Sequence, residues 1–291
     1  MIVVEAEPSG QQTETATHPR KAPSNLSLRI MSAVVLAPLA LTAAYVGGWL
    51  FMVFWGAAAA GILWEWFSIV GSRQEYKALA AAGCGLFAAW VFAYAGRWDI
   101  GFDCLLLGCV IAALLGPPAR RGWLAAGTLY AGIVLLAPML LRGDAEYGFA
   151  AIVFLFAVVW GTDIFAYLAG RSFGGPKLAT RISPNKTWSG ALGGAFAAGC
   201  IGLLAGILLH AASIIPLLLV AFGISVVAQA GDFFESWVKR RFGAKNSSEL
   251  IPGHGGLMDR LDGFVTAALA AAIIGIARGG LDAPARALML W

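Results

Sequence analysis

The stretch YGFAAIVFLFAVVWGTDIFAYLAG, residues 147–170, decides the fold class of this chain. One charged side chain, Asp163, interrupts it. A helix needs about 20 consecutive apolar residues to cross the hydrocarbon core of a bilayer, and the stretch is long enough to do so. It therefore predicts a membrane-spanning helix with an acid near one end.

The composition extends this prediction to the whole chain. Of the 291 residues, 59% are hydrophobic and 12% are charged, and the mean hydropathy is +0.78. An ordinary soluble domain is about one-quarter charged. The chain has more apolar surface than one globular core can bury, so soluble and disordered classes are excluded. We expect an all-α, polytopic integral membrane protein.

Nine apolar runs indicate about nine transmembrane helices. They cover approximately 30–47, 49–70, 77–96, 100–116, 122–141, 147–170, 189–210, 214–234 and 258–277. Residues 1–27 are polar and lack the basic start and apolar core of a signal peptide, which predicts a mobile cytoplasmic tail. We divide the remainder into an N-terminal membrane region, 28–142, with spans one to five, and a second membrane region, 143–291, with spans six to nine.

The basic residues fall almost entirely on one side of these nine spans. Of the 20 Lys and Arg residues, only Arg97, Arg142, Arg278 and Arg286 lie on the side opposite the N-terminus. Basic loops remain in the cytoplasm, so the N-terminus is predicted to be cytoplasmic and the C-terminus external. The net charge of +4 reflects these loops and indicates no nucleic-acid partner.

The two membrane regions differ in their polar content. Spans one to five hold few charges, and we expect Glu65 and Asp103, near span ends, to lie at the membrane interface. From residue 160 onward the cytoplasmic side is rich in acids, bases, glycines and prolines. Chemistry is therefore predicted in the second region, 143–291, on its cytoplasmic side.

The first polar cluster closes span six and fills the next loop. A charge such as Asp163 below the headgroups costs about 2.5–3.5 kcal/mol, so it needs a partner, a cavity or a cation. An acid that braces neighbouring helices is the alternative. Ser183, Lys186 and Thr187 offer hydroxyls and a cation to a phosphate, although an ordinary basic loop also explains them.

The second cluster ends span eight. On a continuing helix Asp232, Glu235 and Ser236 share one face, and Lys239 and Arg240 follow one turn later. Bases at a cytoplasmic helix end often serve only as an anchor to anionic lipid. The preceding acids favour a site in which carboxylates hold a divalent ion and bases hold phosphates.

The third cluster opens span nine. Its polar and glycine residues are Lys245, His254, Gly255, Gly256, Asp259, Arg260 and Asp262. Glycines permit close approach of backbone to a ligand, and a helix N-terminus offers N–H groups to anions. Capping explains one acid here but not the whole set. Because carboxylates with phosphates suit Mg²⁺ and no cysteine lies nearby, we expect magnesium rather than zinc.

At these residues the chain resembles the phosphatidate cytidylyltransferase family, also called CDP-diacylglycerol synthases. The family signature is approximately S-x-x-K-R-x-x-x-x-K-D, a short gap, then P-G-H-G-G-x-x-D-R-x-D. The matching residues are Ser236, Lys239, Arg240, Lys245, Pro252-Gly253-His254-Gly255-Gly256, Asp259-Arg260 and Asp262. Gly231-Asp232-x-x-Glu235 and Ile182-Ser183-Pro184-x-Lys186-Thr187-Trp188 also match. Three positions depart from the family pattern: Asn185 replaces Lys, Ser189 replaces Glu and Asn246 replaces Asp.

The resemblance implies a nucleotidyltransferase that converts CTP and phosphatidate into CDP-diacylglycerol and pyrophosphate in phospholipid biosynthesis. It implies Mg²⁺ on Asp232 and Asp259, with Glu235 and Asp262 as supporting acids. Lys239, Arg240, Lys245 and Arg260 would hold phosphates; Ser183, Lys186, Thr187 and Ser236 would contact substrate; His254, Gly255 and Gly256 would shape the loop. Asp232, Asp259, Lys239 and Arg260 form the expected catalytic set.

The implied partners are CTP, phosphatidate and membrane lipids, with a second copy of the chain if it forms a homodimer, in the inner cell membrane. Three alternatives remain open at this point. One is a CTP-dependent kinase of an isoprenoid alcohol, and another is a membrane transporter. The third is a catalytically silent paralogue, which the departures at Asn246 and Ser189 motivate.

Overall fold

The computed structural model describes residues 25–251 and 255–291, with side chains from residue 34 onward. Over this part the chain forms nine long helices. They are α1 (Asn25–Val46), α2 (Gly48–Ile69), α3 (Tyr76–Tyr94), α4 (Trp98–Leu115), α5 (Arg121–Arg142), α6 (Gly148–Phe173), α7 (Trp188–Leu208), α8 (Ile215–Arg241) and α9 (Met258–Gly279). The shorter elements are the 3₁₀ turn η1 (Pro118–Arg120), an antiparallel hairpin of β1 (Lys177–Ala179) with β2 (Ser183–Thr187), and α10 (Pro284–Met289).

The all-α membrane architecture is confirmed. In the described part of the chain, eight helices are long and apolar enough to cross a membrane, and Val34–Val46 of α1 forms a shorter apolar helix. Each expected span corresponds to one of the nine helices. Two boundaries differ by more than three residues. Helix α1 begins at Asn25, inside the predicted tail, and α8 continues through its basic residues to Arg241.

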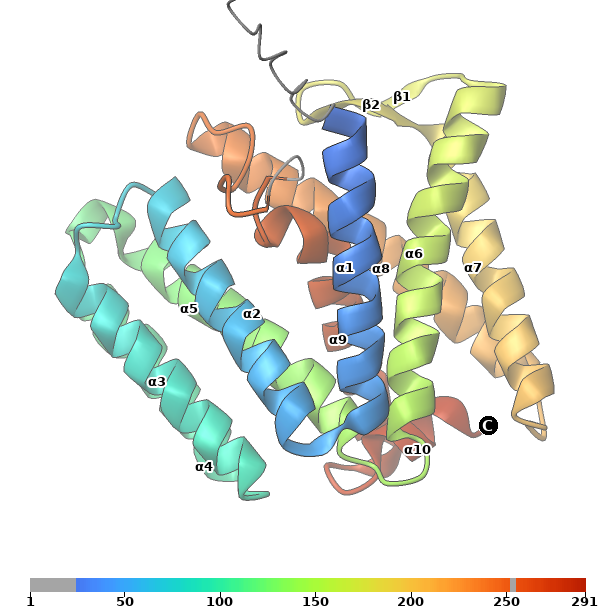
Figure 1. Cartoon of the computed structure of the whole chain (residues 1–291), viewed down its shortest axis with the longest axis horizontal. Helices are drawn as coiled ribbons and strands as arrows, with labels where there is room; N and C mark the ends of the chain where they lie inside the picture. The colour runs from blue at the N-terminus through green and yellow to red at the C-terminus, as the bar shows by residue number, and fades with distance from the viewer. Residues whose placement is uncertain (1–24, 252–254) are drawn as a thin grey trace, which may run out of the picture.

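The start of α1 and the C-terminus lie at opposite ends of the helix bundle (Figure 1). The start of α1, the turn between α2 and α3, the β-hairpin and the connection from α8 to α9 lie at the upper end in this view. Helix α10 and the C-terminus lie at the lower end. The nine described long helices, an odd number, produce this arrangement. The arrangement gathers the three polar clusters at one end of the bundle.

Large apolar side chains cover much of the outer surface. Phe87 of α3 is 65% exposed, and Phe196 of α7 is 73% exposed. Exposed apolar surface on this scale is rare on soluble monomers. Lipid tails accept it at no cost, which fits helices that stand in a bilayer.

Aromatic side chains join the N-terminal membrane region to the last two long helices. The Trp66 ring of α2 lies 5.3 Å from Tyr130 of α5 and 6.2 Å from Phe234 of α8, between ring centroids. Trp55 of α2 stacks on Phe264 of α9 at 4.9 Å. Helices α2 and α5 are therefore packed against the helices that carry the acids.

Candidate active site

Helices α8 and α9 approach each other closely at two glycines, Gly231 of α8 and Gly263 of α9. A Cβ added to Gly231 would stand 2.8 Å from the Asp262 carbonyl oxygen, and one added to Gly263 would stand 3.2 Å from the Ala228 carbonyl oxygen. Each glycine neighbours an acid in the sequence. The close crossing therefore brings Asp232 of α8 into electrostatic range of Asp262 of α9.

Asp232 is held from the neighbouring hairpin by a lysine. The ammonium group of Lys186 on β2 forms an ion pair with Asp232 Oδ2 and lies 4.5 Å above the Phe233 ring. Ser236, one turn along α8, donates a hydrogen bond of 3.4 Å to Asp232 Oδ1. The hairpin thus brings a cation to a carboxylate and a hydroxyl of α8 that lie at least 46 residues away in the sequence.

A cavity of about 720 Å³ opens beside this pair. Its walls come from α6, the hairpin, α7 and α8. The charged and polar residues that line it are Asp163, Tyr167, Arg171, Lys177, Asn185, Lys186, Thr187, Gln229 and Asp232. Both charge signs line one hollow whose volume falls in the range of small-molecule sites. The cavity suits a polyanionic ligand that binds together with a cation.

Asp163 of α6 belongs to the same cluster. It lines the cavity and interacts electrostatically with Asp232, Lys186 and Arg260. The sequence singled out its position inside an apolar run but did not assign it to the site. The structure adds it as a third carboxylate beside Asp232 and Asp262.

A second charged group lies one turn further along α8. Lys239 forms ion pairs with Glu235 Oε2 at 2.6 Å and with Asp259 Oδ1. Glu235 is 1% exposed, and its Oε1 has no hydrogen-bond partner in the part of the chain that the structure describes. A buried carboxylate oxygen without a partner is costly, so Lys239 is the group that compensates this acid.

Asp259 organises the loop that precedes α9. Its Oδ2 accepts hydrogen bonds from the Ser247 amide at 2.9 Å, the Ser247 hydroxyl at 2.8 Å and the Gly256 amide at 2.8 Å. Gly255 has a φ of +84°, a left-handed conformation that favours glycine. The loop therefore wraps around Asp259, and Lys239 holds the remaining oxygen.

Glu65, which the sequence predicts near a membrane interface, lies inside the protein between α2 and the start of α9. Its side chain is fully buried. Its carboxylate accepts hydrogen bonds from Ser248 Oγ at 2.6 Å and from the amides of Leu257 and Met258, each at 2.7 Å. The signal that could have found it is its isolation in an apolar span, the same argument that singled out Asp163.

Thr187 and Ser183 hold structural positions in the hairpin. The Thr187 hydroxyl accepts a hydrogen bond of 3.2 Å from the Gly190 amide and so caps α7. Ser183 pairs with Ala179 at the start of β2 and is half-buried. Thr187 also lines the cavity, so one residue serves both the helix start and the candidate site.

Three more of the predicted residues, Arg240, Lys245 and Arg260, belong to the end of α8, its connection to α9, and the start of α9. Arg240 is exposed and donates to the Ala244 carbonyl at 3.2 Å, and Lys245 is exposed in the connection to α9. Arg260 interacts electrostatically with Asp163. His254 falls outside the described residues. The contacts thus tie Arg260 to the acid cluster, while Arg240 stabilises the end of α8.

The carboxylates fit a magnesium ion in donor chemistry. In the described residues, no three His, Cys, Asp or Glu side chains already stand as a metal site. Mg²⁺ commonly takes only one or two protein carboxylates and completes its shell with water and substrate phosphates. Asp232 and Asp262, within electrostatic range of each other beside the glycine crossing, offer two such carboxylates. The predicted pairing of Asp232 with Asp259 stays a prediction, because each is bonded to a different lysine.

All three departures from the family pattern can be placed, and Asn246 is exposed in the connection from α8 to α9. The Ser189 hydroxyl bonds to the Gly174 carbonyl and lies 3.1 Å from the Thr187 hydroxyl. Asn185 lines the cavity. Ser189 therefore contributes to the local structure of the hairpin, and Asn185 changes the charge of the cavity wall.

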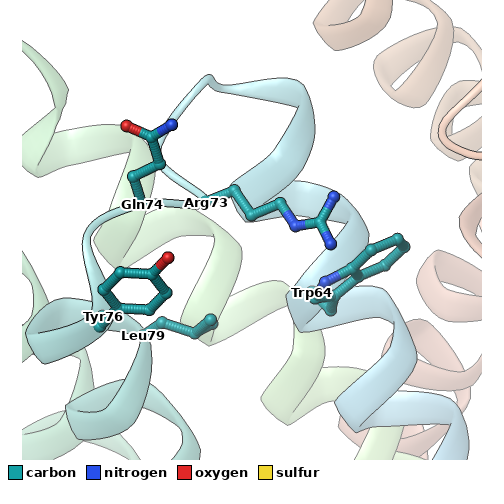
Figure 2. A pocket seen from close by; sticks show the side chains of 5 residues that line it. All are labelled: Trp64, Arg73, Gln74, Tyr76 and Leu79. Carbon is teal, nitrogen blue, oxygen red and sulfur yellow. The ribbon is translucent and has the colours of Figure 1, made fainter.

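A separate hollow of about 470 Å³ lies at the turn between α2 and α3. Figure 2 shows its five lining residues, with the Arg73 guanidinium directed toward Trp64. The guanidinium carbon is 4.9 Å from the centre of the indole ring. The lining holds no acid, so this hollow is distinct from the carboxylate cluster.

The fold and the paired charges define a polytopic membrane enzyme, and comparison with known proteins identifies its class as nucleotidyltransferase. The model of the cytidylyltransferase family matches residues 27–276, and the chain belongs to this family. A protein named phosphatidate cytidylyltransferase from Brucella suis is 46% identical over 90% of this chain and 97% of its own length. Proteins of the same name from Pseudomonas aeruginosa and Rickettsia bellii are 34% and 30% identical, over 83% and 85% of this chain and 94% and 90% of their own lengths.

Proposed function

We propose that this chain is a phosphatidate cytidylyltransferase, which forms CDP-diacylglycerol and pyrophosphate from CTP and phosphatidate. One observation carries the proposal. In a member of the cytidylyltransferase family, the ion pair between Lys186 of β2 and Asp232 of α8 lines a cavity at one end of a membrane bundle, and a second lysine-paired carboxylate, Asp259 of α9, is held by Lys239 two turns further along α8. This is the arrangement that a reaction between a lipid phosphate and a nucleoside triphosphate requires.

The reaction needs little acid–base chemistry from the protein. The phosphomonoester of phosphatidate has a second pKa of about 6 and is largely ionised near neutral pH. One of its oxygens attacks the α-phosphorus of CTP, the new P–O bond forms, and the bond to the β-phosphate oxygen breaks. Pyrophosphate leaves with the electron pair of that bond. Positioning and charge neutralisation supply most of the catalysis in such transfers.

The basic residues of the site bring two anions together. Lys186, which pairs with Asp232 and lines the cavity, would bind the triphosphate or the lipid phosphate. Lys239 and Arg260 would bind the phosphates from the α9 side, with Arg240 and Lys245 at the rim. Ser183, Thr187 and Ser236 add hydroxyl donors. On substrate binding, ion pairs within the cluster would exchange for pairs with phosphate oxygens.

Mg²⁺ is the cofactor that the carboxylates favour. We propose that Asp232 and Asp259 bind it, with Glu235 and Asp262 in support, as the family resemblance implies. When bound, the ion would neutralise charge that grows on the departing pyrophosphate. Asp262 lies within electrostatic range of Asp232, so it is the acid to compare with Asp259 in a magnesium titration.

The membrane arrangement would serve the two substrates separately. Basic loops indicate that the site end faces the cytoplasm, which contains CTP, and we place the protein in the inner cell membrane. Phosphatidate would enter sideways from the surrounding lipid. A homodimer remains a prediction to be tested by mass measurement in detergent.

The direct test uses purified protein with CTP, Mg²⁺ and phosphatidate. CTP labelled in the cytidine ring and, separately, at the γ-phosphate distinguishes the main alternatives. We expect ring label in a liponucleotide and γ-label in pyrophosphate. Transfer of the γ-label to an isoprenoid alcohol would support the kinase. No product with either acceptor would support a silent paralogue or a transporter, and would overturn the proposal.

A further inference from the structure

We propose that Glu65 of α2 is a positioning residue of the active site: it caps helix α9 from outside that helix and fixes the loop that holds Asp259. The proposal rests on the function proposed above for its kinetic consequences, but its structural consequences can be measured without any activity. It gives the N-terminal membrane region a part in the reaction.

The start of α9 lacks a capping side chain of its own. The residue before the helix is Leu257, which makes no side-chain capping bond. The first amides of a helix have no partner within the helix and must find one elsewhere. The amides of Leu257 and Met258 donate to Glu65 Oε1 and Oε2, each at 2.7 Å. Glu65 therefore supplies the cap from a helix that lies about 190 residues earlier in the chain.

The charge and burial of Glu65 suit this role. A carboxylate is stabilised at the positive end of the helix dipole, and here both oxygens are used. Ser248, in the connection from α8, adds a hydrogen bond of 2.6 Å to Oε1. A fully buried acid persists in an apolar span only when its oxygens are satisfied in this way.

The same contact reaches the predicted site residues. A Cβ on Gly256 would overlap both the Ser247 hydroxyl and the Glu65 carboxylate, so Glu65 and the loop backbone are in direct contact. The Gly256 amide and Ser247 in turn donate to Asp259 Oδ2. One layer of bonds thus separates Glu65 from Asp259, and any movement of the loop would move that carboxylate.

Glu65→Gln is the informative variant. The amide keeps the size of the side chain but replaces one acceptor oxygen by a donor, so one of the two helix amides loses its partner. Ser248→Ala is a milder variant that removes one bond to the same carboxylate. Glu75→Gln, at the partly exposed start of α3, is the matched control for loss of a carboxylate from the same region.

Two measurements decide the proposal. Hydrogen–deuterium exchange of peptides covering residues 245–262 should be at least tenfold faster in Glu65→Gln, with a smaller rise in Ser248→Ala and no change in Glu75→Gln. In Glu65→Gln, kcat at saturating CTP should fall about 10- to 100-fold, and the magnesium concentration for half-activation should rise. Both effects should be smaller in Ser248→Ala and absent in Glu75→Gln. The size follows from the sensitivity of transfer reactions to small displacements.

The outcomes separate this proposal from the proposed function. Unchanged exchange in Glu65→Gln would overturn the capping role. Faster exchange with normal kcat and normal magnesium dependence would overturn the positioning role. If the wild type forms no liponucleotide but the exchange pattern appears as expected, the proposed function fails while the capping of α9 by Glu65 stands. Ser248→Ala provides the same readouts if Glu65→Gln does not fold.

Discussion

At the scale of single residues, the site consists of acids that are each matched to a particular base or amide. Lys186 pairs with Asp232, Lys239 pairs with both Glu235 and Asp259, and loop amides complete Asp259. The pairs are partly buried, so their energies depend on both members being present. Substitutions at these positions should therefore act on stability and chemistry together, and the two effects have to be measured separately.

The magnesium assignment gives the first prediction. Asp232→Asn and Asp259→Asn should each lower magnesium-dependent turnover by at least about 100-fold while the protein still inserts into the membrane, because an amide is a weak ligand for a hard cation. Activity over a magnesium titration measures this. Asp103→Asn, at an exposed position of α4, is the control. Near-normal turnover in Asp259→Asn, together with loss in Asp262→Asn, would move the second ligand from Asp259 to Asp262.

Lys239 gives the second prediction. Lys239→Ala should raise the KM for CTP or for lipid, and it should lower the free energy of unfolding by about 3–5 kcal/mol because it leaves Glu235 buried without a cation. Thermal unfolding in detergent and initial rates measure the two effects. Arg241→Ala, at the exposed end of the same helix, is the control.

A double variant separates stability from phosphate binding. Glu235→Gln with Lys239→Ala removes the unpaired charge, so we expect it to regain most of the lost stability while the kinetic defect remains. Full kinetic recovery in the double variant would mean that Lys239 only compensates Glu235 and does not bind phosphate.

At the scale of elements, close helix crossings determine which acids meet. Glycines at the contact of α8 with α9 let the two backbones approach until carbonyl oxygens touch the glycine positions. Small residues are the common means of helix packing in membranes. Here they also set the chemistry, because Gly231 precedes Asp232 and Gly263 follows Asp262.

Gly231→Ala should therefore impair both stability and activity. The added methyl group would overlap Thr266 Oγ1 and stand 2.8 Å from the Asp262 carbonyl, which forces α8 and α9 apart. Overpacking of this kind costs about 1–3 kcal/mol. Gly223→Ala, on the same helix with open space at its Cβ position, should leave activity unchanged and raise stability slightly. Equal behaviour of the two variants in unfolding and rate measurements would contradict this account.

At the scale of the whole molecule, the bundle separates a charged end from an apolar body. The clusters, the hairpin and the α8–α9 connection share one end, and α10 lies at the other (Figure 1). An exposed ion pair of 2.6 Å between Arg286 and Glu146 ties α10 to the connection between α5 and α6. The long helices between these ends present the surface that contacts lipid.

This arrangement predicts the sidedness of two exposed positions. In a background without the four native cysteines, Asn246→Cys should react with a membrane-impermeant maleimide only after the cytoplasmic face is opened. Asp282→Cys should react from outside in intact cells. Both positions are exposed. Labelling of both from the same side would mean that α9, the one long helix described between them, does not cross the membrane, and would contradict the nine-span topology.

The sequence by itself determined the membrane class, the position of each long helix and the family. Each of these depends on local properties: apolar run length, the distribution of basic loops, and motifs such as Gly231-Asp232 or Asp259-Arg260 whose residues are neighbours in the chain. A continuous apolar run in lipid has few alternatives to a helix, since every backbone group must be bonded internally. For that reason the prediction of spans succeeded even without tertiary information.

Only the tertiary structure decided which charges meet. The pairing of Lys186 with Asp232, the addition of Asp163 to the cluster and the capping of α9 by Glu65 join residues from different helices. Sequence periodicity reports which residues share a face of one helix, but it does not report which faces pack together. Packing depends on close contacts such as the ones at Gly231 and Gly256. The contact at Gly256 places the Glu65 carboxylate, from an apolar early span, within one layer of bonds from Asp259.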